Sequence, residues 1–219
     1  MIKLNKRLTT ISAFILENDK VIDIGCDHNL LAIYMYLEKG IKIVGSDINS
    51  EPLNIARNNL SKYDLSNTLE LRLGDGISTI KDEDTVVISG MGGITITKIL
   101  ENINNYNIKK LIISPNDNFP LTRKFITNKG FIIDKEVMVC ENNKYYLVSV
   151  YKKGKEEINY FFGKLDLTNK DNINYFNYVI EKNNRIISKL NYKHPISKIK
   201  LKLENKKIIM GIKERLKNN

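Results

Sequence analysis

The sequence lacks tryptophan and has only two cysteines, two histidines and four prolines among its 219 residues. Two cysteines without a CxxC or Cys/His cluster exclude a disulfide framework and a zinc-type centre, so we expect no metal. No apolar run approaches the ~18 residues that span a membrane, and the first residues lack the apolar core of a secretion signal. These absences predict a cytoplasmic globular protein that binds no metal and does not associate with a membrane.

Positive charge is abundant but unevenly distributed, with a formal net charge of +10. Residues 1–155 contain 21 Lys and Arg against 18 Asp and Glu, whereas residues 156–219 contain 14 against 7. Because 29 lysines accompany 28 asparagines and 33 isoleucines, an A/T-rich genome could account for part of the excess. The placement indicates a nearly neutral domain at 1–155 and a basic element at 156–219 that docks a polyanion, with a solvated tail as the alternative.

Short apolar runs alternate with helical patterns over the first domain. The runs that we expect to be strands are residues 21–25, 41–47, 68–73, 85–89, 110–114, 131–140 and 144–151. A helix is expected at residues 5–17, before the first strand, and others at residues 30–39, 94–104 and 120–129, with one more that begins near residue 50. The last two strands flank Glu141-Asn142-Asn143, a hairpin turn. This order predicts an α/β fold with a doubly wound, mostly parallel seven-stranded sheet that ends in an antiparallel hairpin.

The C-terminal region changes to a purely helical pattern. Apolar residues recur three and four positions apart from Ile173 to Leu190, with Asn183 at one seam position, as in a coiled coil. Pro195 interrupts the run, and a looser helical pattern follows it. We expect a two-helix hairpin and a monomeric protein; a dimer formed through these helices is the alternative.

The loop after the first strand contains Gly25 and then Asp27. A dinucleotide-binding loop would have a second glycine at position 27, so that a pyrophosphate could approach a helix N-terminus. A carboxylate there would repel a pyrophosphate, which disfavours NAD and a dehydrogenase. It suits a cationic ligand, and S-adenosylmethionine carries both an ammonium and a sulfonium.

Three further loops follow successive strands. Asp47 ends the second strand and could accept hydrogen bonds from both ribose hydroxyls of a nucleoside. Asp75 and Gly76 follow the third strand, where a carboxylate could accept from an adenine amino group. Gly90 and Met91 follow the fourth. Because the carboxyl ends of parallel strands meet at one sheet edge, these loops predict one nucleoside-cofactor site.

Five short motifs occur along the chain in this order: Lys6-Arg7-Leu8, Asp23-Ile24-Gly25-Cys26-Asp27-His28, Gly74-Asp75-Gly76, Gly90-Met91-Gly92-Gly93 and Ser114-Pro115-Asn116. Together they resemble the bacterial tRNA (adenine(22)-N(1))-methyltransferase family over nearly the whole chain. The resemblance implies a Rossmann-like class I methyltransferase fold that uses S-adenosylmethionine and releases S-adenosylhomocysteine. Carried over by position, and with the neighbouring Ile48 and Gly90 included, the expected cofactor site consists of Asp23, Gly25, Asp27, His28, Asp47, Ile48, Asp75, Gly76, Gly90 and Met91.

The chemistry of adenine N1 fits the residues present. Many adenine-N6 methyltransferases have an Asp/Asn-Pro-Pro-aromatic loop after the fourth strand, but here that place holds Gly90 to Gly93. Neutral adenine already presents a lone pair at N1, so no general base is required and positioning supplies most of the catalysis. Asn116, in the loop after the fifth strand, is the candidate to hydrogen-bond the target base.

Basic residues recur at helical spacing in the C-terminal region, so each set shares one helix face. The residues expected to contact tRNA are Arg7 in the first helix, Lys182, Arg185, Lys189 and Lys193 in one C-terminal helix, and Lys198 and Lys202 in the other. Two other functions remain open at this point. One is a class I methyltransferase acting on a small molecule or a protein, and the other is an RNA-binding module with a vestigial cofactor pocket.

Overall fold

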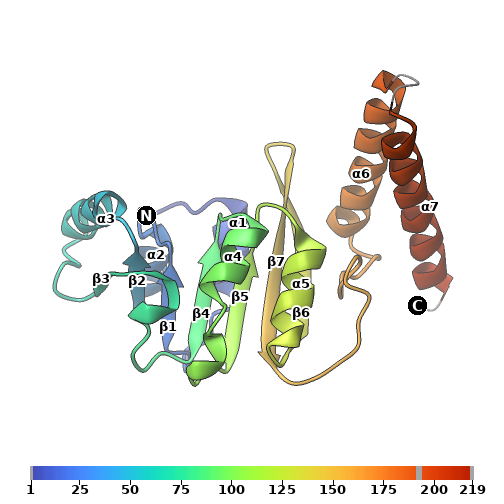
Figure 1. Cartoon of the computed structure of the whole chain (residues 1–219). Helices are drawn as coiled ribbons and strands as arrows, with labels where there is room; N and C mark the ends of the chain where they lie inside the picture. The colour runs from blue at the N-terminus through green and yellow to red at the C-terminus, as the bar shows by residue number, and fades with distance from the viewer. Residues whose placement is uncertain (1, 191–193, 218–219) are drawn as a thin grey trace. The chain divides into compact units, whose positions relative to one another are not determined.

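The computed structural model describes residues 2–190 and 194–217 (Figure 1). In chain order its elements are α1 (Lys6–Ala13), β1 (Val21–Ile24), α2 (Leu30–Lys39), β2 (Ile43–Asp47), α3 (Ser50–Lys62), β3 (Leu71–Leu73), η1 (Gly76–Thr79), β4 (Thr85–Ser89), α4 (Gly93–Ile99), η2 (Ile103–Asn105), β5 (Lys110–Ser114), α5 (Phe119–Asn128), β6 (Phe131–Glu141), β7 (Lys144–Lys153), α6 (Lys170–Lys189) and α7 (Pro195–Lys217). Strands and helices alternate as far as β6, and helices alone follow β7.

The strands form one sheet in the order β3-β2-β1-β4-β5-β7-β6. Strands β1 to β5 pair in parallel, whereas β7 pairs antiparallel with both β5 and β6. At the tip of the β6–β7 hairpin, Asn142 and Asn143 have φ values of 49° and 60°, a left-handed pair that matches a type I′ turn. The expected doubly wound sheet with its closing hairpin is confirmed.

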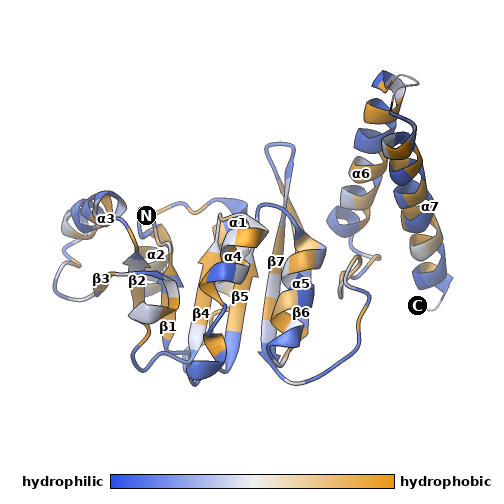
Figure 2. Cartoon of the chain, viewed as in Figure 1, coloured by the Kyte–Doolittle hydropathy of each residue, from blue (hydrophilic) through white to orange (hydrophobic). Residues whose placement is uncertain are grey.

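Hydrophobic side chains cover both faces of the central strands, because successive residues of a strand point to opposite faces. Val21 and Val87 pack with Ile11 of α1 and Leu31 of α2 in one core cluster. A second cluster combines alternate residues of the same strands with side chains of α4 and α5, including Ile22, Val86, Ile96 and Ile126. Figure 2 shows this concentration of hydrophobic residues in β4 and β5. Both faces of the sheet are therefore buried, and ligands have access at its edge.

Three elements are shorter by three residues or more than the sequence pattern predicts. Helix α1 ends at Ala13, before a turn in which the Asp19 carboxylate accepts a hydrogen bond from the Leu16 amide. Strand β3 begins only at Leu71, because the amides of Thr68 and Leu69 bond to a preceding carbonyl in a turn. Helix α4 ends at Ile99, and a separate 3-10 turn follows. Apolar periodicity does not report these local turns.

The chain divides into two compact units, residues 1–164 and 165–219. The expected boundary was at residue 155, where the composition changes. Residues 156–164 belong to the first unit because Arg123 of α5 donates hydrogen bonds to the carbonyls of Tyr160 and Phe161, each 2.9 Å long. The Glu136 carboxylate also accepts from the Lys164 amide at 2.8 Å. A buried ion pair therefore holds this segment on the first unit.

The second unit consists of α6 packed against α7. Hydrogen bonds between asparagine side chains cross the seam between the two helices. Asn183 is 5% exposed, and its side-chain amide donates to the Asn205 side chain at 2.9 Å. Asn205 in turn donates to the Asn184 side chain at 2.9 Å. The seam predicted at Asn183 thus closes within one chain.

Helix α7 leaves a part of its apolar pattern in contact with solvent. Ile196, Ile199 and Leu203 are 72%, 56% and 60% exposed, whereas Ile208 is fully buried. Only some of the regularly spaced apolar residues of α7, such as Ile208, are therefore buried against α6. No helix in the described ranges is long and apolar enough to cross a membrane.

The buried Arg123–Glu136 pair supplies a prediction for stability. Its nitrogen and oxygen lie 2.8 Å apart, and the side chains are 1% and 0% exposed. We expect Arg123→Met to lower the free energy of unfolding by roughly 3–5 kcal/mol, because it leaves a carboxylate buried without its cation. Urea denaturation measures this change. Lys20→Met, which removes an exposed pair with Asp82, is the matched control and should cost less than about 1 kcal/mol; equal losses in the two variants would contradict the prediction.

Candidate active site

Backbone hydrogen bonds bring the loops after β1, β2 and β3 together at one edge of the sheet. The amides of Gly25 and Cys26 both donate to the Ser46 carbonyl, at 2.8 and 3.0 Å. The Gly74 amide donates to the Asp47 carbonyl at 3.0 Å. The loops that bear Asp27, Asp47 and Asp75 are therefore neighbours, as the sequence predicts.

Carboxylates gather around the buried Cys26 thiol. Burial raises the pKa of this thiol, and the nearby charges of Asp23, Asp47 and Asp27 raise it further. Because the thiol stays protonated near neutral pH and only a thiolate is a good nucleophile, Cys26 is unsuited to nucleophilic catalysis. The same three carboxylates create a negative field at this edge, which favours a cationic ligand.

Gly25 provides a place where backbone alone faces the loop after β4. Its φ of +76° lies in the left-handed region that favours glycine, and a Cβ there would overlap the Met91 methyl group. Met91, in the loop after β4, thus packs directly on the loop after β1. Two predicted cofactor residues that are far apart in the sequence are in contact.

Asp27 and His28 lie exposed at the rim of this edge. The His28 Nε2 is 3.5 Å from an Asp27 carboxylate oxygen, and the side chains are 50% and 70% exposed. The His28 carbonyl accepts from the Asn59 side chain of α3 at 3.0 Å. The structure thus places His28 beside Asp27, as expected if the imidazole helps to hold the carboxylate.

Asp47 and Ile48 begin the loop after β2. One Asp47 oxygen accepts from the Asn49 amide at 2.9 Å, which fixes the carboxylate while its other oxygen has no hydrogen bond in the described part of the chain. Ile48 is 59% exposed, so its apolar surface is accessible to a ligand. Both features fit contact with a nucleoside.

A cavity of about 580 Å³ opens beside Asp75 and Gly76 at the start of η1. Ser78, Lys98 and Tyr106 contribute to its wall, together with other residues of η1, α4 and η2. Gly76 has a φ of +50°, in the left-handed region. The predicted position for adenine recognition therefore borders an open volume.

Asp23 is the buried acid of the site. It is 5% exposed, and burial raises its pKa to about 7, with partial compensation by the Arg7 guanidinium. A carboxylate in this state changes its charge near neutral pH. A neighbouring ammonium group of a ligand would favour the ionised form.

The loops after β4 and β5 are joined by a network of short hydrogen bonds. The Asn116 side-chain amide donates to the Gly90 carbonyl at 2.6 Å, and the Asn116 backbone amide donates to the Met91 carbonyl at 2.8 Å. One Asp117 oxygen accepts from the Gly93 amide at 2.8 Å. Asn116 thus fixes the loop expected to contact the cofactor; its contact with a target base remains a prediction. No sequence motif predicts a role for Asp117, although its place beside Asn116 after β5 is a usable signal.

Arg7 reaches the same network from α1. Its Nη1 donates to the Asn116 side-chain oxygen at 3.3 Å, and its guanidinium lies over the Tyr146 ring of β7, 4.9 Å from the centroid. Arg7 was expected to contact tRNA, and the structure places it among the loops of the cofactor edge. Tyr146 was not predicted, because nothing in a strand sequence marks its position beside these loops.

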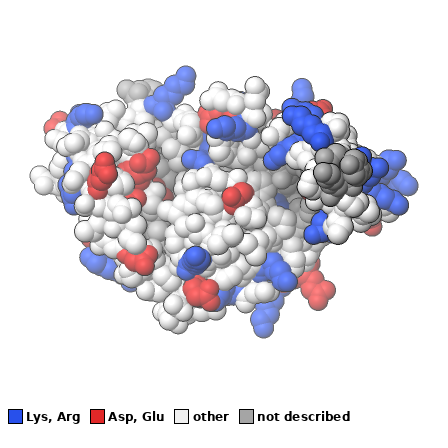
Figure 3. Space-filling view, turned by 45° about the horizontal axis from the view of Figure 1, so that its top comes forward, with Lys and Arg blue, Asp and Glu red and all other residues white. Residues whose placement is uncertain are grey.

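The basic residues of the second unit are mostly exposed on its two helices. Lys182, Arg185 and Lys189 are exposed on α6, and Lys202 is exposed on α7, whereas Lys198 is half-buried. The predicted residue Lys193 lies outside the described residues. Figure 3 shows blue Lys and Arg side chains around the helical part at the right, and a mixture of both charges elsewhere.

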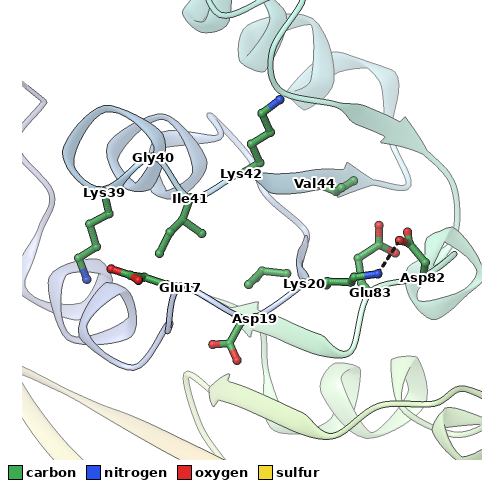
Figure 4. A pocket seen from close by; sticks show the side chains of 11 residues that line it. Glu17, Asp19, Lys20, Lys39, Gly40, Ile41, Lys42, Val44, Asp82 and Glu83 are labelled. Carbon is green, nitrogen blue, oxygen red and sulfur yellow. Dashed lines mark hydrogen bonds and ion pairs between the residues drawn. The ribbon is translucent and has the colours of Figure 1, made fainter.

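A second cavity, of about 500 Å³, lies by the residues that precede β1 and β2, away from the carboxyl ends of the strands (Figure 4). Its charged side chains include Lys20, which pairs with Asp82 at 3.2 Å, and Asp19, which pairs with Lys110. Lys39 donates to a backbone carbonyl at 3.2 Å. Because these groups already serve structural contacts and ligands of doubly wound sheets bind at the opposite edge, we assign it no ligand.

Comparisons with known proteins agree with this geometry. The sequence profile of a family described as "Methyltransferase domain" matches residues 4–149. The fold and the site thus define a methyltransferase.

The tRNA (adenine(22)-N(1))-methyltransferase of Bacillus subtilis (strain 168) is 31% identical over 164 residues, which cover 73% of this chain and 69% of that protein. A putative tRNA methyltransferase of Mycoplasma genitalium is 29% identical over 160 residues, 70% of this chain and 72% of that protein. The chain belongs to the tRNA (adenine(22)-N(1))-methyltransferase family, and the resemblance inferred from its motifs is confirmed.

Solved structures extend the similarity to the second unit. A structure of M. capricolum TrmK in complex with S-adenosyl-homocysteine is 27% identical, with a TM-score of 0.83, and the match covers 96% of this chain and 98% of that one. The B. subtilis m1A22 tRNA methyltransferase TrmK is 26% identical, with a TM-score of 0.76, over 100% and 99% of the two chains. The helical C-terminal region is therefore shared with these enzymes.

The contact between Gly25 and Met91 supplies a prediction for cofactor binding. We expect Gly25→Ala to reduce the affinity for S-adenosylhomocysteine at least tenfold, because the new methyl group displaces Met91 and occupies space that a ligand needs. Isothermal titration calorimetry measures the affinity. Gly40→Ala is the matched control, because Gly40 has a similar φ of +69° but no atom within 4 Å of an added Cβ. If both variants bound the ligand as the unmodified protein does, the assignment of Gly25 would be wrong.

The raised pKa of Asp23 predicts a pH dependence of binding. If Asp23 contacts the ligand ammonium, only its ionised form attracts that group, so the affinity for S-adenosylhomocysteine should rise as pH increases through about 7 and then level off. Titrations from about pH 6 to about pH 8 measure this profile. Asp23→Asn should bind more weakly and show a flatter profile, and identical profiles for the two proteins would contradict the role of Asp23.

Proposed function

We propose that this chain transfers a methyl group from S-adenosylmethionine to N1 of an adenine in tRNA, at position 22 as in the family to which it belongs. The observation that carries the proposal is the gathering of Asp27, Asp47 and Asp75 on neighbouring loops at one sheet edge. A family relative in this fold binds S-adenosyl-homocysteine.

The residues at the sheet edge fit this cofactor. The cluster of carboxylates suits a ligand with a positive charge, and Asp47 has an oxygen available for ribose hydroxyls. Gly25 lets Met91 pack against the loop after β1, and Met91 and Ile48 present apolar surface for an adenine ring. When bound, S-adenosylmethionine supplies an electrophilic methyl group on a sulfonium.

The opposite side of the site orients the base. Because N1 of adenine carries a lone pair, this chain need not remove a proton before attack, and positioning contributes on the order of 7–11 kcal/mol. Asn116 and Arg7 fix the loops after β4 and β5, next to where the base must enter. A carboxylate beside the bound base, such as that of the exposed Asp117 next to Asn116, would stabilise the positive charge that the base acquires.

The second unit supplies affinity for the RNA. Residues 165–219 contain 13 Lys and Arg against 5 Asp and Glu, and the basic side chains of α6 point into solvent. Such a surface binds a phosphate backbone without reading sequence. The seam between α6 and α7 closes within one chain, which supports action as a monomer. A tRNA substrate agrees with the expected cytoplasmic location.

A labelling experiment tests the function. The full-length protein, incubated with methyl-labelled S-adenosylmethionine and unmodified tRNA, should transfer label to the RNA and create one position that blocks reverse transcription, because a methyl group at N1 prevents base pairing. No transfer to any tRNA in a pool would overturn the proposal. A stop at a different adenine would overturn only the assignment of position 22.

Charge reversal on the full chain tests the division of labour in the same assay. Lys182→Glu, Arg185→Glu and Lys189→Glu together should raise the KM for tRNA about tenfold or more and leave the affinity for S-adenosylhomocysteine unchanged. The matched control reverses three exposed lysines of the first unit, Lys42, Lys62 and Lys124. Equal effects of the two triple variants would show that only net charge matters. A deletion from residue 156 is unsuitable because it removes the segment that Arg123 holds.

A further inference from the structure

Tyr146 and Arg7 form a stacked pair beside the loop that follows β5. Tyr146 lies on β7, opposite Val139 of β6, and its ring faces the guanidinium carbon at 4.9 Å from the centroid. Both side chains are half-buried. Tyr146 is therefore not sealed inside the core.

The pair stands beside the loop that follows β4. A Cβ placed on Gly90 would lie 3.3 Å from the Arg7 Nη2, and Arg7 also bonds to the Asn116 side chain. Burial raises the pKa of Asp23, and the Arg7 charge partly offsets this rise. Arg7 thus connects the cofactor loops with Tyr146, at the edge where a target base must approach a bound cofactor.

Two hydrogen bonds hold α1 on the β6–β7 hairpin next to this pair. The Lys6 amide donates to the Glu141 carboxylate at 2.9 Å, and the Lys6 ammonium donates to the Cys140 carbonyl at 3.2 Å. Because Lys6 precedes Arg7 directly, these bonds fix the position from which the guanidinium extends. The stacked pair is therefore in place before a substrate binds.

An adenine whose N1 edge is engaged inside folded RNA must be turned out of its stack, and the protein must replace the lost stacking. Aromatic rings do this for any base, and they also attract a base that gains positive charge during methylation. A guanidinium attracts such a base less well, because both would be cationic. Of the two members of the pair, the tyrosine ring is the suitable surface.

We propose that Tyr146 forms the stacking surface for the extruded adenine and that Arg7 is its positioning residue. This inference rests on the proposed function, since it concerns the nucleotide that receives the methyl group. The alternative is that the pair serves only to attach α1 to the hairpin.

Kinetics of full-length variants provide the first test. Tyr146→Leu should lower kcat about tenfold or more and leave the affinity for S-adenosylhomocysteine unchanged, whereas Tyr146→Phe should keep most activity because the ring remains. Tyr145→Leu, a substitution of the neighbouring half-buried tyrosine, is the matched control and should change kcat less than about twofold. Retention of full activity by Tyr146→Leu would overturn the inference.

A double-mutant comparison separates stacking from an effect through Arg7. If Tyr146 contacts the base, Tyr146→Leu should still lower kcat in an Arg7→Gln background, but by a smaller factor because Arg7 positions the ring. If the tyrosine acts only by holding Arg7, the second substitution should have no further effect, and that result would overturn the inference.

Fluorescence supplies a readout that does not depend on activity. The chain has no tryptophan, so Tyr146→Trp introduces a single probe. Its emission should be quenched more by tRNA that contains the target adenosine than by tRNA that is abasic at that position, and Tyr145→Trp should not distinguish them. Equal quenching of the Tyr146→Trp emission by the two RNAs would overturn the inference. Absence of methyl transfer by the unmodified protein would instead overturn the proposed function.

Discussion

The parallel pairing of β1 with β2 and β4 is the constraint on which the whole site depends. It aligns Ile24 with Ser46 on one side and with Ile88 on the other, so the three following loops leave the sheet together. Residues that are far apart in the sequence, such as Gly25 and Met91, then touch. Since the strands are buried on both faces, a slip by one residue would turn every side chain to the opposite face and disrupt the packing of both cores. The stability of the core and the geometry of the cofactor edge thus have the same origin.

Buried charge links the N-terminal helix to this edge. Asp23 lies inside the sheet, where burial favours its neutral form and the Arg7 guanidinium favours its charged form. Arg7 also bonds to Asn116 and stacks on Tyr146, so one side chain joins α1, the loop after β5 and the terminal hairpin. Helix α1 therefore contributes Arg7 to the candidate active site and also covers one face of the sheet.

The two units place different physical demands on their residues. Methyl transfer requires atoms held within a narrow geometry, and the first unit meets that demand with short hydrogen bonds such as those of Asn116 and Asp117. Attraction of a phosphate backbone tolerates variable positions, and exposed lysines on α6 can provide it. The family to which the chain belongs is named for a reaction on tRNA that would use both properties.

The sequence by itself determined the order of strands and helices, the glycine and carboxylate positions of the cofactor edge, and the seam residue Asn183, because each has a local signal in spacing or residue type. It did not determine the ends of α1 and β3, where turn hydrogen bonds override apolar periodicity, or the attachment of residues 156–164, which depends on Arg123 and Glu136. It also gave no indication of Tyr146. Only the tertiary structure decided which faces of distant elements meet around Arg7, because such contacts arise from strand register and helix packing, which no short stretch of residues encodes.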